Sequence, residues 1–185
     1  MFQNSLEDVR LSGNKNLTSI PTPGENLKIL SLVSCDINSL PSVLFQHSLE
    51  HVDLDGNINL LPIPSPGKSL TFLCINMCNV RTLPSDLFQN SLEEAQLNNN
   101  KNLQSIPNPG KTLKILDLAE CDIRSLPSDL FQYSLQEVYM SKNKGESRMG
   151  VPAFYIGRSD VNNDDVDDDR DREKVELLIQ LFYRH

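Results

Sequence analysis

The feature that most constrains this chain is an internal repeat of 43 residues, seen in the spacing of four phenylalanines: Phe2, Phe45, Phe88 and Phe131. Three of them lie in nearly identical heptapeptides, LFQHSLE at Leu44, LFQNSLE at Leu87 and LFQYSLQ at Leu130. A fixed period of this length predicts an array of stacked units. One unit cannot bury its apolar face alone, so neighbouring units must supply a shared core.

Each 43-residue unit contains two related halves. The first half of the opening unit runs from Leu6 to Pro21 and reads L-x-x-V-x-L-x-x-N-x-x-L-x-x-I-P; the second runs from Leu27 to Pro41 and reads L-x-x-L-x-L-x-x-C-x-I-x-x-L-P. This L-x-x-L-x-L-x-x-N/C pattern resembles the leucine-rich repeat family. The resemblance covers roughly residues 2–143, which hold six full repeats and the start of a seventh at Leu135.

Alternation with period two around each L-x-L predicts a short strand with its leucines facing inward. The resemblance implies an α/β fold: a curved right-handed solenoid with a parallel sheet on its concave side, and loops and short helical turns on its convex side. The first halves contain IPTPG, IPIPSPG and IPNPG, which predict extended chain with turns at Gly24, Gly67 and Gly110. The second halves contain LPSVLF or LPSDLF, which predict short helical turns that bury the phenylalanines.

The pattern divides the chain into a repeat array, residues 1–143, and a C-terminal cap, residues 144–185. Near the end, Val175, Leu178, Ile179 and Phe182 share one helical face, which predicts an amphipathic helix covering the last repeat. The acidic loop 160–173 opens with the spacing of an EF-hand, but Asp165 replaces its glycine and Asp171 its glutamate. We therefore expect a solvated loop, and no metal or cofactor is predicted.

The N-terminus begins in the middle of a repeat, without a recognisable cap, a basic start or a long apolar run. The first strand, near residues 6–11, is expected to present an unpaired edge. Two interpretations follow. The chain is a fragment of a longer repeat protein, or its edge is covered by another chain, including edge-to-edge association with a second copy.

The cysteines follow the repeat. The resemblance implies an inward-pointing ladder at the end of the strands, formed by Asn14, Cys35, Asn57, Cys78, Asn100, Cys121 and Asn143. Equivalent cysteines should lie two strand spacings apart, about 9–10 Å, which is too far for disulfides. Cys74 is instead expected to face solvent beside Asp53, whose charge raises the pKa of the thiol. No oriented base supports catalysis there.

Function in such a solenoid is expected on the concave sheet. A stripe of outward apolar residues within an acidic surround is a candidate protein-binding patch. The proposed contact residues are Ile29, His51, Asp53, Phe72, Cys74, Glu94, Ile115, Asp117 and Tyr139. They predict a protein partner with a basic rim and an apolar centre.

Charge and hydropathy limit the classes of function that the chain can have. A formal net charge of −8 disfavours nucleic-acid binding, and no apolar run is long enough to span a membrane. We therefore expect a non-enzymatic protein-interaction module or scaffold. The alternative is a substrate-recognition or regulatory fragment of a larger enzyme or receptor with leucine-rich repeats. Unbridged cysteines favour a cytoplasmic location. The sequon at Asn16 leaves an extracellular receptor fragment as the alternative.

Overall fold

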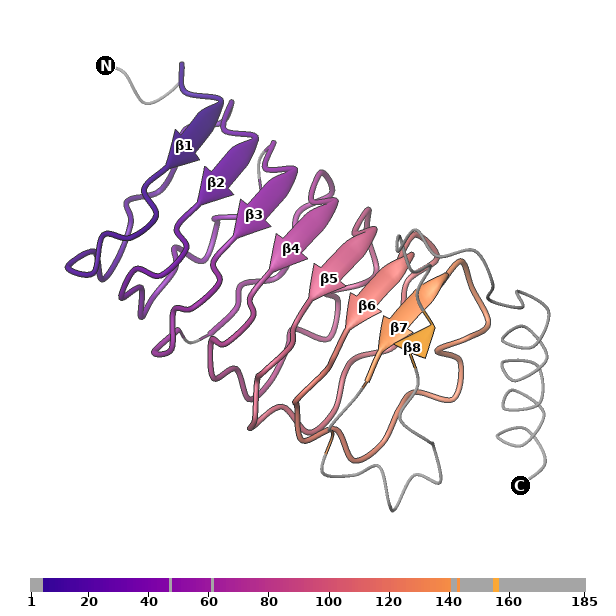
Figure 1. The fold of residues 1–185 in the computed structure, drawn as a ribbon. Helices are drawn as coiled ribbons and strands as arrows, with labels where there is room; N and C mark the ends of the chain where they lie inside the picture. The colour runs from indigo at the N-terminus through magenta and orange to yellow at the C-terminus, as the bar shows by residue number, and fades with distance from the viewer. Residues whose placement is uncertain (1–4, 47, 61, 141–142, 144–154, 157–185) are drawn as a thin grey trace, which may run out of the picture.

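The computed structural model describes residues 5–46, 48–60, 62–140, 143 and 155–156 (Figure 1). Within them the chain forms a parallel β-solenoid of about six turns. The predicted acidic loop and capping helix lie outside the described residues.

One eight-stranded sheet runs the length of the solenoid in the order β1 to β8. Its strands are β1 (Asp8–Arg10), β2 (Ile29–Ser31), β3 (His51–Asp53), β4 (Phe72–Cys74), β5 (Glu94–Gln96), β6 (Ile115–Asp117), β7 (Glu137–Tyr139) and β8 (Tyr155–Ile156). Strands β1 to β7 are parallel, whereas β8 pairs antiparallel with β7. The solenoid's last parallel strand is therefore covered by a short strand that the repeat pattern did not predict.

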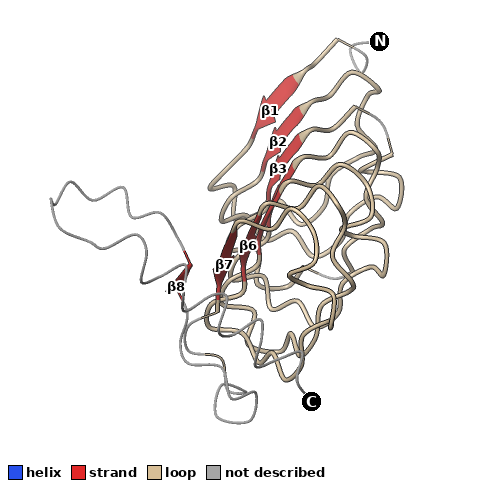
Figure 2. Cartoon of the chain, turned by 90° about the vertical axis from the view of Figure 1, so that its right-hand side faces the viewer, coloured by secondary structure: helices blue, strands red, loops and turns tan. Residues whose placement is uncertain are grey.

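Each three-residue strand turns its middle side chain into the core. In β2 to β7 these are buried residues, namely Leu30, Val52, Leu73, Ala95, Leu116 and Val138. The flanking strand residues point to the other face of the sheet, as a period of two requires. The loops that complete each turn lie on the core side of the sheet, so the strands form one wall of the solenoid (Figure 2).

The described residues contain no helix, so the structure does not support the predicted short helical turns. The segment after Pro41 instead forms hydrogen-bonded turns, in which the amide of Leu44 donates to Pro41 O and the amide of Gln46 donates to Val43 O. These bonds start at alternate amides, so no run of successive bonds builds a helix. The solenoid consists of strands, turns and loops.

The turns nevertheless bury phenylalanine. Phe45 and Phe88 are fully buried, whereas Phe131, in the last described Phe turn, is only half-buried. A Cβ on Gly67 would lie 1.6 Å from Phe45 O, and one on Gly110 would lie 1.5 Å from Phe88 O. These two glycines therefore allow neighbouring turns to pack in backbone contact.

Candidate binding face

The register of the sheet arranges the outward side chains in two columns. The first column contains Asp8, Ile29, His51, Phe72, Glu94, Ile115 and Glu137, and the second contains Arg10, Ser31, Asp53, Cys74, Gln96, Asp117 and Tyr139. All nine predicted contact residues lie in these columns. We call this surface, the two columns together with residue 55, the outer face.

The outer face carries an apolar ridge, formed by Ile29, His51 and Phe72 on adjacent strands and, beyond Glu94, by Ile115. The rings of His51 and Phe72 are stacked, with centroids 4.0 Å apart and planes within 5° of parallel. All four side chains are half-buried rather than fully exposed. The stack fixes both rings, so the ridge presents an ordered apolar strip.

Beside the ridge lies a group of carboxylates: Asp53, Asp55, Glu94, Asp117 and Glu137. Their hydrogen bonds come from neutral groups; Asn98 Nδ2 donates to Asp117 Oδ2 at 2.7 Å, and Gln96 Nε2 donates to Glu94 Oε1 at 2.7 Å. Within the described part of the chain none of the five forms an ion pair. The face therefore carries uncompensated negative charge.

The row just before the strands behaves differently. Lys28 Nζ lies 2.9 Å from Glu7 Oε2, and Lys114 Nζ lies 2.6 Å from Glu93 Oε2. Both pairs are exposed and join neighbouring turns of the solenoid. Exposed pairs contribute little stability, so their main effect is to neutralise this row.

Asp55 was not among the predicted contact residues. Its Oδ1 is buried without a hydrogen-bond partner among the described residues. Burial, and secondly the charge of Asp53, raises the pKa of the Asp55 carboxyl. The alternation of the strand could have indicated this residue, because position 55 follows His51 and Asp53 on the same face.

Cys74 does not face solvent, and that prediction is wrong. Its exposed fraction is 4%, and Asn76 Nδ2 lies 3.3 Å from Cys74 Sγ. Burial raises the pKa of the Cys74 thiol to about 12, and the charge of Asp53 adds to the effect. The carboxylate acts in the predicted direction, but burial is the larger cause. The thiol is therefore a protonated packing element, not a nucleophile.

Beneath the outer face, the ladder asparagines tie each turn to the one before. Asn57 Nδ2 donates to Leu32 O at 2.9 Å and to Leu54 O at 2.7 Å, while its Oδ1 accepts from the amide of Ile37 at 2.9 Å. Asn100 and Asn143 make the equivalent three bonds. The asparagines therefore satisfy buried backbone groups in two turns at once.

The ladder cysteines make fewer hydrogen bonds than the ladder asparagines. The thiols of Cys35, Cys78 and Cys121 donate to Leu11 O, Leu54 O and Leu97 O at 3.2, 3.1 and 3.2 Å. All four cysteines of the chain are free and buried.

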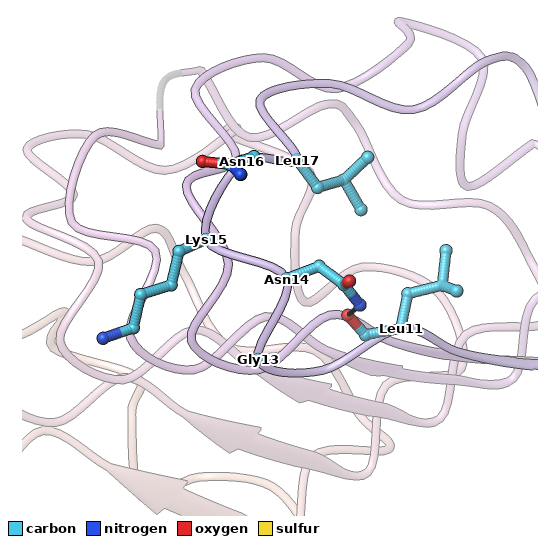
Figure 3. Close-up of a pocket in the computed structure, with 6 residues that line it drawn as sticks. All are labelled: Leu11, Gly13, Asn14, Lys15, Asn16 and Leu17. Atoms are coloured by element: carbon cyan, nitrogen blue, oxygen red, sulfur yellow. Dashed lines mark hydrogen bonds between the residues drawn. The ribbon is translucent and has the colours of Figure 1, made fainter.

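The first turn lacks the full set of ladder hydrogen bonds. Asn14 is exposed, and its side chain makes one hydrogen bond, from Nδ2 to Leu11 O at 2.6 Å. Its Oδ1 points into an open cleft lined by residues of the same turn (Figure 3). The N-terminal end of the described solenoid is therefore an incomplete stacking surface.

The raised thiol pKa values predict how stability depends on pH. Cys74 and Cys78 have pKa values of about 12 and Cys121 of about 11, mainly because of burial, whereas unfolded thiols ionise near pH 8.5. Stability should be unaffected below about pH 8.5 and should fall above it, because ionisation then favours the unfolded chain. We expect roughly 1 kcal/mol per thiol to be lost between about pH 7.5 and pH 9.5.

Urea unfolding at both pH values measures this loss. Replacing Cys74 with alanine should reduce the loss by about a third, since one of the three shifted thiols is removed. A pH dependence that is unchanged in Cys74→Ala would contradict the assignment for that thiol.

These features define a repeat protein of the parallel β-solenoid class with an acidic outer face. Comparison with known proteins adds no relative, since no family model and no curated protein matches the chain. Among the described residues, no cluster of three or more histidine, cysteine or acidic side chains is arranged to hold a metal ion. Nor does that part of the chain contain a helix long and apolar enough to cross a membrane.

Proposed function

We propose that this chain is a leucine-rich repeat protein that binds another protein through its outer face and performs no chemistry of its own. The repeat pattern and the parallel solenoid together support the family. The buried, protonated Cys74 supports a non-enzymatic role for the outer face, because its thiol is neither accessible nor ionised near neutral pH.

One observation carries the proposal: the five carboxylates of the outer face form no ion pair with any described residue, and they flank an ordered apolar ridge. A partner with a basic rim would satisfy the carboxylates, and an apolar centre would cover the His51–Phe72 stack. The charges should mainly set the association rate and the choice of partner, and the ridge should supply the buried apolar contact.

Met77 extends this surface beyond the strands. Its side chain is 45% exposed, and its backbone has a φ of 51°, which is unfavourable for a bulky residue. The same positive φ occurs at Ser34 and Glu120, the equivalent positions of the other repeats, so it belongs to the repeated turn, and the exposed apolar side chain is what points to binding. We therefore include Met77 at the edge of the proposed interface.

We also place the protein in a reducing compartment, the cytoplasm. The four free thiols are the support for this proposal. A structure with four buried cysteines and no bridge gains nothing from an oxidising environment.

The test is capture of partners from native extract by the wild-type chain and by two outer-face variants. Phe72→Glu/Ile115→Glu places charge on the ridge, and Asp53→Asn/Asp117→Asn removes charge from the rim. We expect the ridge variant to lose the partner. The rim variant should retain the partner at low salt, and it should release it at a lower concentration of added salt than the wild type does.

The matched control is Ile58→Glu/Tyr133→Glu, which adds the same charge at exposed apolar residues outside the strands. It should capture as the wild type does. Circular dichroism must show that all variants are folded. A partner that is retained by the ridge variant, or lost equally from the control, would contradict binding through the outer face.

A further inference from the structure

Strand β1 is the first strand of the sheet, and no other described strand lies beside its outer edge (Figure 1). Glu7 O accepts from the amide of Ile29 at 3.0 Å, and the amide of Leu11 donates to Ser31 O at 2.9 Å, so these groups face β2. Because backbone groups alternate along a strand, those of Asp8 and Arg10 face the other way. Their N–H and C=O groups have no partner among the described residues.

The core beneath this edge is also open. Leu6 is 55% exposed and Leu11 is 42% exposed, although their counterparts in the next five turns are buried. They line a cavity of about 210 Å³, together with Val9, Ile20 and Leu27. The unsatisfied strand edge and the exposed apolar core therefore occur together at one end of the solenoid.

The charges on β1 are self-complementary. Asp8 and Arg10 flank Val9 and lie on the same face, where Arg10 Nε and Asp8 Oδ1 are 3.0 Å apart. A twofold axis passing beside Val9 would bring Asp8 opposite Arg10 of a second copy, and Arg10 opposite its Asp8. An isologous contact requires this kind of complementarity.

We propose that a second copy of this chain docks on the β1 edge, with the two β1 strands antiparallel and Val9 opposite Val9. This interface is separate from the partner site on the outer face. It joins the two sheets edge to edge and leaves both outer faces on the same side of the dimer.

The hydrogen-bond pattern fits this register. In an antiparallel pair, opposed residues alternate between hydrogen-bonded and non-hydrogen-bonded pairs. The backbone groups of Asp8 and Arg10 have no partner among the described residues, so Asp8 forms a hydrogen-bonded pair with Arg10 of the second copy, and Arg10 with its Asp8. Val9 is already bonded to β2 and occupies the non-hydrogen-bonded position. The apolar cavities of the two copies meet on the core side of the junction.

Charge reversal tests the register. In Asp8→Arg, arginines oppose arginines across the junction, and in Arg10→Asp, aspartates oppose aspartates. Each variant alone should be monomeric, with Kd raised roughly a hundredfold or more. An equimolar mixture of the two should form a heterodimer, because every arginine then opposes an aspartate.

Sedimentation equilibrium and native mass spectrometry measure these states against the 20.9 kDa monomer mass. The wild-type chain should be dimeric, and so should Lys68→Asp, which makes the same charge change as Arg10→Asp at an exposed residue outside the edge strand. A wild-type chain that stays monomeric at all concentrations overturns the proposal. So does a mixture that remains monomeric.

A backbone variant tests the edge without relying on charge. Asp8→Pro removes an N–H that faces away from β2, so the sheet within each copy keeps its bonds. It should abolish the dimer, whereas Asp8→Ala, which keeps the N–H, should weaken it less. A dimer that survives Asp8→Pro unchanged overturns pairing through β1.

Discussion

Replacing Asn100 by alanine is expected to lower the free energy of unfolding by about 2–4 kcal/mol, because the buried Ile75 O and Val80 N–H lose their partner and Leu97 O keeps only the thiol of Cys121. Asn100 Nδ2 donates to Ile75 O at 2.9 Å and Leu97 O at 2.7 Å, and its Oδ1 accepts from the amide of Val80 at 2.9 Å. Asn100 has no exposed surface, so water cannot replace these bonds. Urea unfolding followed by circular dichroism measures the loss.

Asn14 is the matched control, because it occupies the same repeat position but is exposed and bonds only Leu11 O. Its alanine variant should cost about 1 kcal/mol or less. Asn100→Cys should fall between the two, since cysteine at this position donates to the preceding turn but cannot accept from its amide. Equal losses at Asn14 and Asn100 would show that the bonds between turns contribute nothing measurable.

Gly110→Ala is expected to destabilise the protein by about 3 kcal/mol or more, through overpacking that the backbone must relieve. The added Cβ would lie 1.5 Å from Phe88 O and 2.6 Å from the Phe88 carbonyl carbon. Neither atom belongs to a flexible side chain, so the turns of two neighbouring repeats would have to separate. Phe88 is fully buried, and such a movement would loosen its packing.

Gly13→Ala separates this steric effect from ordinary backbone strain. Gly13 has a φ of 80°, but a Cβ there would meet nothing within 4 Å. The expected cost is therefore about 1–2 kcal/mol, set by the left-handed conformation alone. Thermal and urea unfolding of both variants test the comparison. A smaller loss for Gly110→Ala than for Gly13→Ala would contradict the close contact between turns.

Much of the fold could be predicted because the repeat determines it locally. The 43-residue period placed the strands, and the alternation within each strand assigned Leu30, Leu73 and Leu116 to the core and Ile29 and Phe72 to the opposite face. These assignments depend on residues close in sequence and on the geometry of a strand, which is the same in every turn.

Other features depend on contacts between particular atoms, within a turn or between turns, which the period does not specify. The exposure of Cys74 was predicted from its direction alone, but the side chain of Asn76 lies against its thiol. Gly110 was predicted as a turn residue, whereas the structure shows that its main constraint is Phe88 O in the adjacent turn. The first contact joins side chains two residues apart in one turn, and the second joins the backbones of neighbouring turns.

The sequence by itself determined the repeat, the strand positions, the inward leucines and the acidic character of the outer face. Only the tertiary structure decided that the described Phe segments are turns rather than helices, that Cys74 is buried and that Asp55 Oδ1 lacks a hydrogen-bond partner among the described residues. The physical reason is that periodicity fixes the direction in which a side chain points. Its burial, its pKa and its hydrogen bonds depend on which atoms the neighbouring turn places beside it.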